Sequence, residues 1–208
     1  MDRTTPEEQL RRLVDAIVAD DSKLFSALLE ASPELAKTSF SEGATRQDSS
    51  SNFLEAIGHT IYAGDTALHL AAAAYRPEIV DTLVEAGASV RAKNRRGVEP
   101  LHSAAVGNPT SPRWNPAAQT ATIARLIAAG ADPNARNMDG ATPLHRAVRT
   151  RCADAVRTLL AHGADPAIRN KNGSTALQLA SGTTGRGGSG SAEAKAQQKE
   201  ILLLLQGR

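Results

Sequence analysis

Two short motifs recur along this 208-residue chain in step with each other. The first, Gly-x-Thr/Glu-x-Leu, begins at four glycines separated by 33, 43 and 33 residues: Gly64, Gly97, Gly140 and Gly173. The second is an apolar residue three positions before Gly-Ala, with the same 43- and 33-residue separations: Gly87, Gly130 and Gly163. A period of this length predicts a stack of supersecondary units that bury their apolar faces against their neighbours.

Each unit is predicted to be a pair of helices. Small residues on the first helix let the next pair approach closely, and they include Ala71, Ala72, Ala104, Ala105 and Ala147. Leucines on the second helix supply the buried apolar layer: Leu83, Leu126 and Leu159. The Gly-Ala glycines follow the second helices, where a left-handed cap is favoured. We therefore expect one elongated all-α domain.

The first-helix motif resembles that of the ankyrin-repeat family, whose signature is Thr-Pro-Leu-His-x-Ala with a 33-residue period. The four copies read Thr66-Ala67-Leu68-His69-Leu70-Ala71, Glu99-Pro100-Leu101-His102-Ser103-Ala104, Thr142-Pro143-Leu144-His145-Arg146-Ala147 and Thr175-Ala176-Leu177-Gln178-Leu179-Ala180. The resemblance covers about residues 61–208. It implies an ankyrin solenoid, in which helix-turn-helix units are joined by β-turn fingers.

The repeat spacing divides the single domain, 1–208, into six parts. They are an N-terminal capping repeat (6–36, with helices near 6–19 and 21–31), an extended first finger (37–60), and repeats at 61–93, 94–136, 137–169 and 170–208. The second and fourth repeats each carry about ten extra residues between their helices. Within the first finger, the polar segment 39–51 is expected to be mobile, and residues 52–57 are expected to form a short helix.

Charge is distributed unevenly, although the formal net charge is only +2. Residues 90–190 contain 14 basic and 5 acidic side chains. This excess favours an acidic protein segment as partner and makes the attachment sensitive to salt. Ankyrin proteins generally bind partners through finger tips and first helices, and by that resemblance the binding residues are Tyr62, Arg95, Arg96, Met138, Asp139, Arg146 and Lys171. The oligomeric state stays open, because the last helix is apolar on all sides.

The two insertions suggest a second kind of site. Parallel stacking would place both on one edge, flanking the turn of the third repeat, beside the N-termini of the second helices. A small phosphate or carboxylate ligand is the alternative to a protein partner, and its candidate residues are Arg113, Trp114, Arg149, Arg151 and Arg186. The competing interpretation is that the glycine-rich insertion is a plain linker and the arginines are solvated.

Enzymatic chemistry and cofactors are not expected. His69, His102 and His145 occupy equivalent motif positions about one helix-pair spacing apart, too far to share a metal, so we assign them structural hydrogen bonds. Cys152, near a helix start, is a candidate reactive thiolate, but no base lies within reach. With 3% aromatic residues there is little to stack on bases, which argues against nucleic acid.

The single cysteine also bears on the cellular compartment in which the protein is expected. One thiol cannot form an intramolecular disulfide or a cysteine-based zinc site, which fits a cytoplasmic protein. No apolar run approaches the roughly 18 residues needed to cross a bilayer, and the first residues lack a signal-peptide stretch. A cytoplasmic protein without a membrane segment is therefore expected.

Overall fold

The computed structural model describes residues 5–45, 48, 52–111, 114–182 and 191–207. Helices dominate, and one short two-stranded ribbon interrupts them. The elements are α1 (Pro6–Ala19), α2 (Ser22–Ala31), the 3-10 helix η1 (Pro33–Ala36), β1 (Phe53–Leu54), β2 (His59–Thr60), α3 (Ala67–Ala73), α4 (Pro77–Glu85), α5 (Pro100–Ala104), α6 (Pro116–Ala128), α7 (Pro143–Arg149), α8 (Ala153–Ala161), α9 (Ala176–Ser181) and α10 (Ala192–Leu205).

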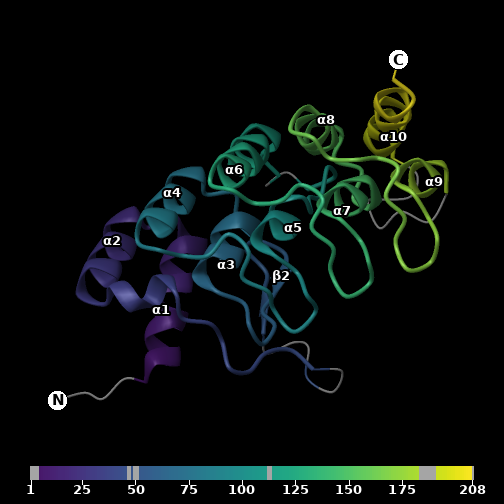
Figure 1. Ribbon diagram of the computed structural model, residues 1–208. Coiled ribbons are helices and arrows are strands. Elements are labelled where there is room, and N and C mark those ends of the chain that lie inside the picture. Colours follow the sequence, from purple (N-terminus) through teal and green to yellow (C-terminus); the bar gives the residue numbers. More distant parts are fainter. Residues whose placement is uncertain (1–4, 46–47, 49–51, 112–113, 183–190, 208) are drawn as a thin grey trace.

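The helix pairs stack side by side in one row (Figure 1). The first helices α3, α5, α7 and α9 form one layer, and α4, α6, α8 and α10 form a second layer beside it. Loops extend from the first-helix layer as parallel fingers, so the all-α solenoid with β-turn fingers is confirmed. The core runs along the row between the layers, where Leu83, Leu126 and Leu159 are fully buried.

Local sequence explains where the helices begin. Thr5 and Glu8 form a capping box at α1, which satisfies two of the free N–H groups of the first turn. Proline occupies the first position of α4 and α6, where its missing N–H costs nothing. The cap helices expected near 6–19 and 21–31 are α1 and α2.

The repeated histidines connect neighbouring units. The Thr66 backbone N–H donates to His69 Nδ1 (3.1 Å), and His69 Nε2 lies 2.9 Å from the Val98 carbonyl oxygen of the next finger. His102 and His145 repeat this geometry toward Ala141 and Ser174. Because Nδ1 accepts a hydrogen bond, the proton sits on Nε2 and the ring is neutral. The structural role assigned to the histidines is confirmed.

The extended first finger differs from expectation. Residues 52–57 do not form a helix; β1 and β2 pair antiparallel, with Phe53 opposite Thr60 and Leu54 opposite His59. Gly58, at φ +60°, supports the turn that reverses the chain, a conformation most side chains avoid. The Ile61 N–H also donates to the Asn52 carbonyl (2.9 Å). The backbone of this short segment is therefore satisfied by the neighbouring strand rather than by a helix.

The segment that precedes the hairpin is also anchored where the structure describes it. Phe40 is 1% exposed, its N–H donates to the Asp65 carbonyl, and its carbonyl accepts from Gly64 N–H. Ala44 is buried and donates to the Ile61 carbonyl. The expectation of a mobile 39–51 segment is wrong for these two residues, because each buries its side chain and pairs its backbone; residues 46–47 and 49–51 lie outside the described part.

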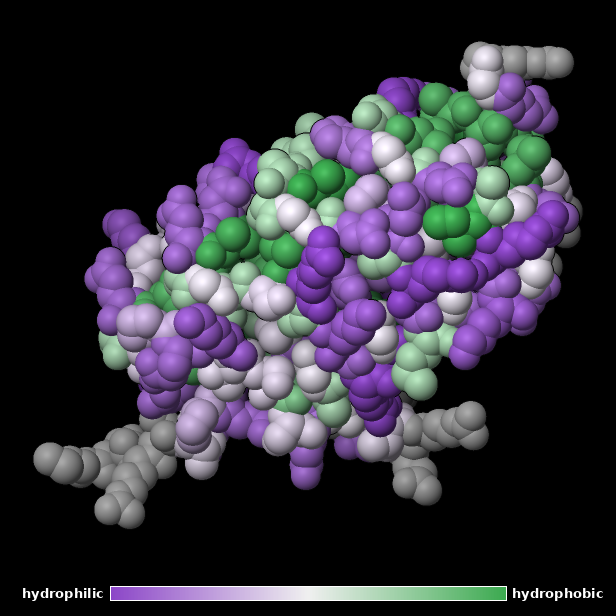
Figure 2. Space-filling view, in the orientation of Figure 1, coloured by the Kyte–Doolittle hydropathy of each residue, from purple (hydrophilic) through white to green (hydrophobic). Residues whose placement is uncertain are grey.

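The last helix, α10, has a mixed surface. Ile201 is buried against the stack, whereas Leu203 is 42% exposed, and apolar side chains gather beside α10 at the upper right of Figure 2. No helix in the described part of the chain is both long and apolar enough to cross a membrane.

Candidate functional site

The predicted finger-tip residues lie in one continuous ladder. Backbone N–H groups of successive fingers donate to carbonyls of the finger before: Arg95 to Ala63 (2.8 Å), Met138 to Arg96 (3.0 Å) and Lys171 to Asp139 (2.9 Å). These bonds fix the spacing between tips, and Met138 is 60% exposed. The structure therefore presents tip side chains from four consecutive fingers along one edge.

A cluster of arginines surrounds Tyr62 on this ladder. The Arg95 and Arg96 guanidinium carbons lie 5.4 Å and 5.2 Å from the Tyr62 ring centre, and Arg96 also donates to the Tyr62 hydroxyl (3.1 Å). Burial, together with the guanidinium groups of Arg96 and Arg149, lowers the pKa of Arg146 to about 10. Arg146 on α7 is thus close enough to both arginines to be repelled by them. We call Tyr62, Arg95, Arg96, Arg146 and Arg149 the arginine cluster.

Two members of the arginine cluster differ from the other arginines in their contacts. Among the described residues, the side chains of Arg146 and Arg149 make no hydrogen bond or ion pair. Arginines on the second-helix layer are paired instead: Arg125 contacts Asp81 and Glu78, and Arg157 contacts Glu200. The arginine cluster thus differs from the paired arginines of the second-helix layer, although Lys93 on the finger side pairs with Glu99 (3.5 Å). Strongly hydrophilic side chains are prominent on the fingers and helices from α5 to α9 in Figure 2.

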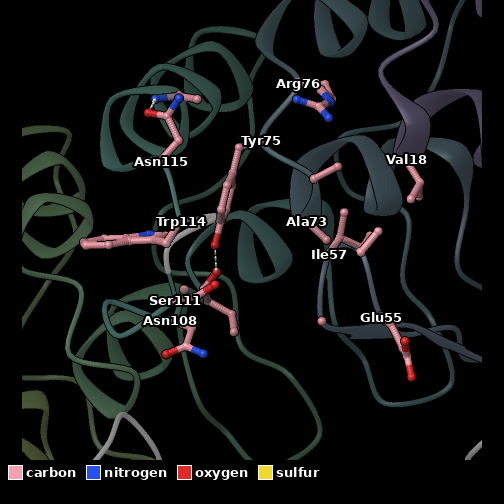
Figure 3. Close-up of a pocket in the computed structure, with 16 residues that line it drawn as sticks. Val18, Glu55, Ile57, Ala73, Tyr75, Arg76, Asn108, Ser111, Trp114 and Asn115 are labelled. Atoms are coloured by element: carbon pink, nitrogen blue, oxygen red, sulfur yellow. Dashed lines mark hydrogen bonds between the residues drawn. The ribbon is translucent and has the colours of Figure 1, made fainter.

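A cavity of about 610 Å³ opens at the ends of the first helices. Four segments line it: the hairpin turn 55–58, the end of α3 through Arg76, the first insertion and start of α6 within 106–118, and Val18 of α1. Tyr75 stands between Trp114 on one side and Ile57 with Ala73 on the other (Figure 3). Tyr75 has φ +55°, which is uncommon for a bulky side chain. This conformation turns its hydroxyl toward the Val106 carbonyl, to which it donates.

Several polar groups at the cavity are bonded within the protein. Trp114 Nε1–H donates to Gln119 Oε1 (2.9 Å), and Asn115 Oδ1 accepts the Ala118 N–H (3.0 Å) as the N-cap of α6. Arg76 pairs with Asp20 (3.2 Å) and donates to the Ile17 carbonyl. The walls also carry apolar side chains: Val18, Ala56, Ile57, Ala73, Ala74, Val106 and Ala118.

The first insertion is clamped to the stack by its tryptophan. Gln119 is fully buried and links Trp114 to the Ala104 carbonyl, to which its Nε2 donates (2.9 Å). A side chain at Gly107 would meet Cys152 Sγ at 2.6 Å and Trp114 Nε1 at 2.7 Å. Only glycine permits this approach. Trp114 and Cys152 therefore both lie close to Gly107.

Two of the residues proposed for an anion site, Arg149 and Arg151, differ in their exposure. Arg149 is exposed at the end of α7, but Arg151, at φ +58°, is only 6% exposed and lines the same small cavity as Leu179 and Ile201. Arg113 and Arg186 lie outside the described residues, so an anion site at the two insertions stays a prediction. At the start of α8, the Ala153 N–H is taken by Gln197 Oε1 (2.8 Å), which leaves this helix end less able to bind an anion.

The environment of Cys152 contradicts the idea of an activated thiolate. The side chain is fully buried, and burial raises the pKa of the Cys152 thiol to about 11. Its Sγ lies 3.4 Å from the Thr150 hydroxyl. A helix start lowers a thiol pKa only where the thiolate stays hydrated or faces a cation, and here burial dominates. Within the described residues, no group of three histidine, cysteine or acidic side chains is placed to hold a metal.

The buried thiol predicts slow chemical modification. In native protein at pH 8, we expect 5,5′-dithiobis(2-nitrobenzoic acid) to label Cys152 roughly 100-fold or more slowly than in guanidinium-unfolded protein, because the raised pKa alone removes most of the thiolate. Trp114→Ala should accelerate native labelling, since the indole and the sulfur both lie next to Gly107 and removing the ring opens this space. Equal labelling rates in native and unfolded protein would show that the thiol is accessible.

Sequence reasoning missed Tyr75 and the hairpin at 53–60, whose turn lines the cavity, and Gln119, which binds the Trp114 indole at the cavity wall. Tyr75 carried one signal, because a lone aromatic residue follows four alanines just before Pro77. Gly58 after an apolar run was the signal for the hairpin. Gln119 gave none, since a glutamine on a helix is ordinarily exposed.

Comparison with known families agrees with this architecture. Residues 63–95 match a family model described as ankyrin repeat, and residues 126–180 match one described as ankyrin repeats in many copies. A search of curated proteins gave no match. The stacked helix pairs and regular fingers define an all-α repeat protein of the solenoid class. The chain is an ankyrin-repeat protein. Ankyrin repeats generally mediate protein–protein interaction and are typically non-enzymatic.

Proposed function

We propose that this protein is a non-enzymatic interaction module that binds an acidic, extended segment of a partner protein along its finger tips and first helices. The observation that carries the proposal is the arginine cluster, in which Arg146 and Arg149 form no ion pair with any described residue and Arg146 is repelled by Arg96 and Arg149. Like charges held close together raise the energy of the free protein, and a carboxylate relieves that repulsion. Arginine donors also suit carboxylates in bidentate geometry.

The shape of the surface favours an extended partner. The ladder and first helices present a row of sites one repeat apart, which a chain of carboxylates can follow. Asp139 lies within this row and contributes the opposite charge, so the complementary segment is acidic but not uniformly so. Met138 adds an exposed apolar contact at the tips. We place the protein in the cytoplasm, in keeping with its single buried cysteine.

The test is binding of a model acidic peptide, followed by fluorescence anisotropy. A peptide of alternating glutamate and serine, about twelve residues or roughly 40 Å when extended, spans several repeats of roughly 10 Å each. We expect Arg96→Glu combined with Arg149→Glu to weaken binding at least about tenfold, because two attractions become repulsions. Raising salt from about 50 mM to about 500 mM should also weaken it.

A matched control keeps the net charge constant. Lys23→Glu combined with Lys199→Glu makes the same charge change at exposed positions on α2 and α10, away from the arginine cluster. If this control weakens binding as much as the arginine variant, the peptide responds to net charge and the proposed surface is wrong. The same conclusion follows if a lysine–serine peptide binds equally well.

A further inference from the structure

The cavity bounded by the hairpin turn and Tyr75 adjoins the arginine cluster. Gly107, which lines the cavity, donates its N–H to the hydroxyl of Thr150 (3.3 Å), the residue that follows Arg149. Arg149 also occupies the same place in its repeat as Val106, a cavity wall residue, does in the preceding one. A partner segment on Arg149 is therefore one repeat away from the cavity.

The hairpin marks the end of the first-helix surface that a partner segment can contact. Leu70 of α3 occupies the motif position that carries Arg146 in α7, yet it is fully buried, and Leu54 and Ile57 of the hairpin pack against the core. The first-helix surface open to a partner thus stops where the turn 55–58 forms a cavity wall. Ala56 and Gly58 in this turn are exposed, as is Asn115 across the cavity, so the cavity is reached from solvent at this point.

The chemistry of the cavity selects against a second carboxylate. Its arginine, Arg76, is paired with Asp20, and the other charged wall residue is an exposed glutamate, Glu55. The hydroxyl of Tyr75 and the indole N–H of Trp114 are directed to protein acceptors. Because these two donors are directed to protein acceptors and apolar side chains such as Ile57, Ala73 and Val106 form part of the walls, the cavity has room for a group that makes few hydrogen bonds.

We propose that this cavity holds an apolar side chain, preferably aromatic, of the same partner segment whose acidic residues lie on the arginine cluster. The inference rests on the proposed function and adds the anchor that sets the register of the segment. A volume of about 610 Å³ accommodates an aromatic ring together with adjacent backbone. Anchors of this kind dominate many interfaces, whereas solvated charges mainly steer association.

The experiment walks one phenylalanine through the glutamate–serine peptide, so that no register is assumed. We expect at least one position to bind about tenfold or more tightly than the parent peptide, as burial of an aromatic side chain predicts. Ala118→Trp, which fills the cavity from α6, should abolish that gain. The matched control, Ala117→Trp, adds the same ring at an exposed neighbouring position outside the cavity and should preserve it.

A second filling variant protects the test against misfolding. Ala56→Trp enters from the opposite wall, and circular dichroism establishes that each variant is folded before binding is measured. The inference is overturned if no phenylalanine position improves binding, or if the gain survives both filling variants. The two proposals fail separately: a parent peptide that depends on Arg96 and Arg149 without any anchor effect leaves the proposed function intact. An anchor effect without dependence on these arginines overturns the proposed function and the link to the arginine cluster, and leaves only the binding of an apolar side chain in the cavity.

Discussion

Acidification from pH 7 to pH 5 is expected to lower the free energy of unfolding by about 2 kcal/mol through His102 alone. Burial, with the nearby Arg146 guanidinium, lowers the pKa of His102 to about 3, below its ordinary value of 6.5. Below pH 6.5 the unfolded chain takes up a proton at His102 that the folded chain does not. The contribution of His102 to the free energy of unfolding is therefore complete above pH 6.5 and is lost as the pH falls below it. Burial also lowers the pKa of His69 and His145, which adds to the loss.

The measurement is urea unfolding at several pH values, with His102→Gln as the diagnostic variant. Glutamine occupies the same motif position in the last repeat, where Gln178 Oε1 accepts the Thr175 N–H (2.9 Å). An amide keeps an acceptor and a donor without titrating. The change in the free energy of unfolding between pH 7 and pH 5 should therefore be smaller by about the contribution expected from His102.

His162→Gln is the control, because His162 is exposed and its Nδ1 bonds only to its own helix at Thr158. Its pH dependence should match that of the unmodified protein. Glu99, whose pKa is raised by burial, acts in the opposite sense, so the difference between variants is the quantity that matters. If the free energy of unfolding of His102→Gln depends on pH as strongly as that of the unmodified protein, the imidazole of His102 is not buried in its neutral form.

Gly64→Ala is expected to lower the free energy of unfolding by about 3 kcal/mol or more, well above the effect of an ordinary surface substitution. Gly64 has φ +85°, where a left-handed backbone alone costs an L-residue roughly 1–2 kcal/mol. An added Cβ would also lie 2.8 Å from the Asn94 Cα and 3.0 Å from the Lys93 carbonyl oxygen. Because both contacts are with backbone, the adjacent finger itself must shift.

Asn94 makes that shift costly. It is 6% exposed, its Nδ2 donates to Asp65 (2.8 Å), and its Oδ1 accepts the N–H groups of Arg96 (2.9 Å) and Val98 (3.1 Å). Displacing Asn94 therefore disturbs the finger that carries two residues of the arginine cluster. Peptide binding should weaken together with stability.

Gly163→Ala separates the clash from the backbone strain. Gly163 has nearly the same φ, +86°, but an added Cβ meets nothing within 4 Å. Chemical denaturation should show that Gly163→Ala lowers the free energy of unfolding by only about 1–2 kcal/mol. Equal losses for the two alanine variants would show that the close approach of the fingers is not what constrains Gly64.

The repeat fold could be predicted from the sequence because its determinants are local and recur. The Thr-x-Leu-His copies, the Gly-Ala turns and the proline starts each act within a few residues, and periodic stacking multiplies their effect. Finger-tip residues such as Arg96 and Met138 follow from the same register. Their position in one ladder was predictable because each finger repeats the hydrogen bond of the one before.

The cavity and the balance of charge could not be predicted in this way. The hairpin at 53–60 joins the stack through contacts with residues distant in sequence, and the left-handed turn at Tyr75 depends on a carbonyl 31 residues away. Arg149 and Arg151 are two positions apart, yet a positive φ directs one to solvent and buries the other. The sequence by itself determined the periodic frame, since short-range patterns specify helix pairs and turns. Only the tertiary structure decided which arginines stay unpaired and where a cavity opens, because these depend on contacts between repeats.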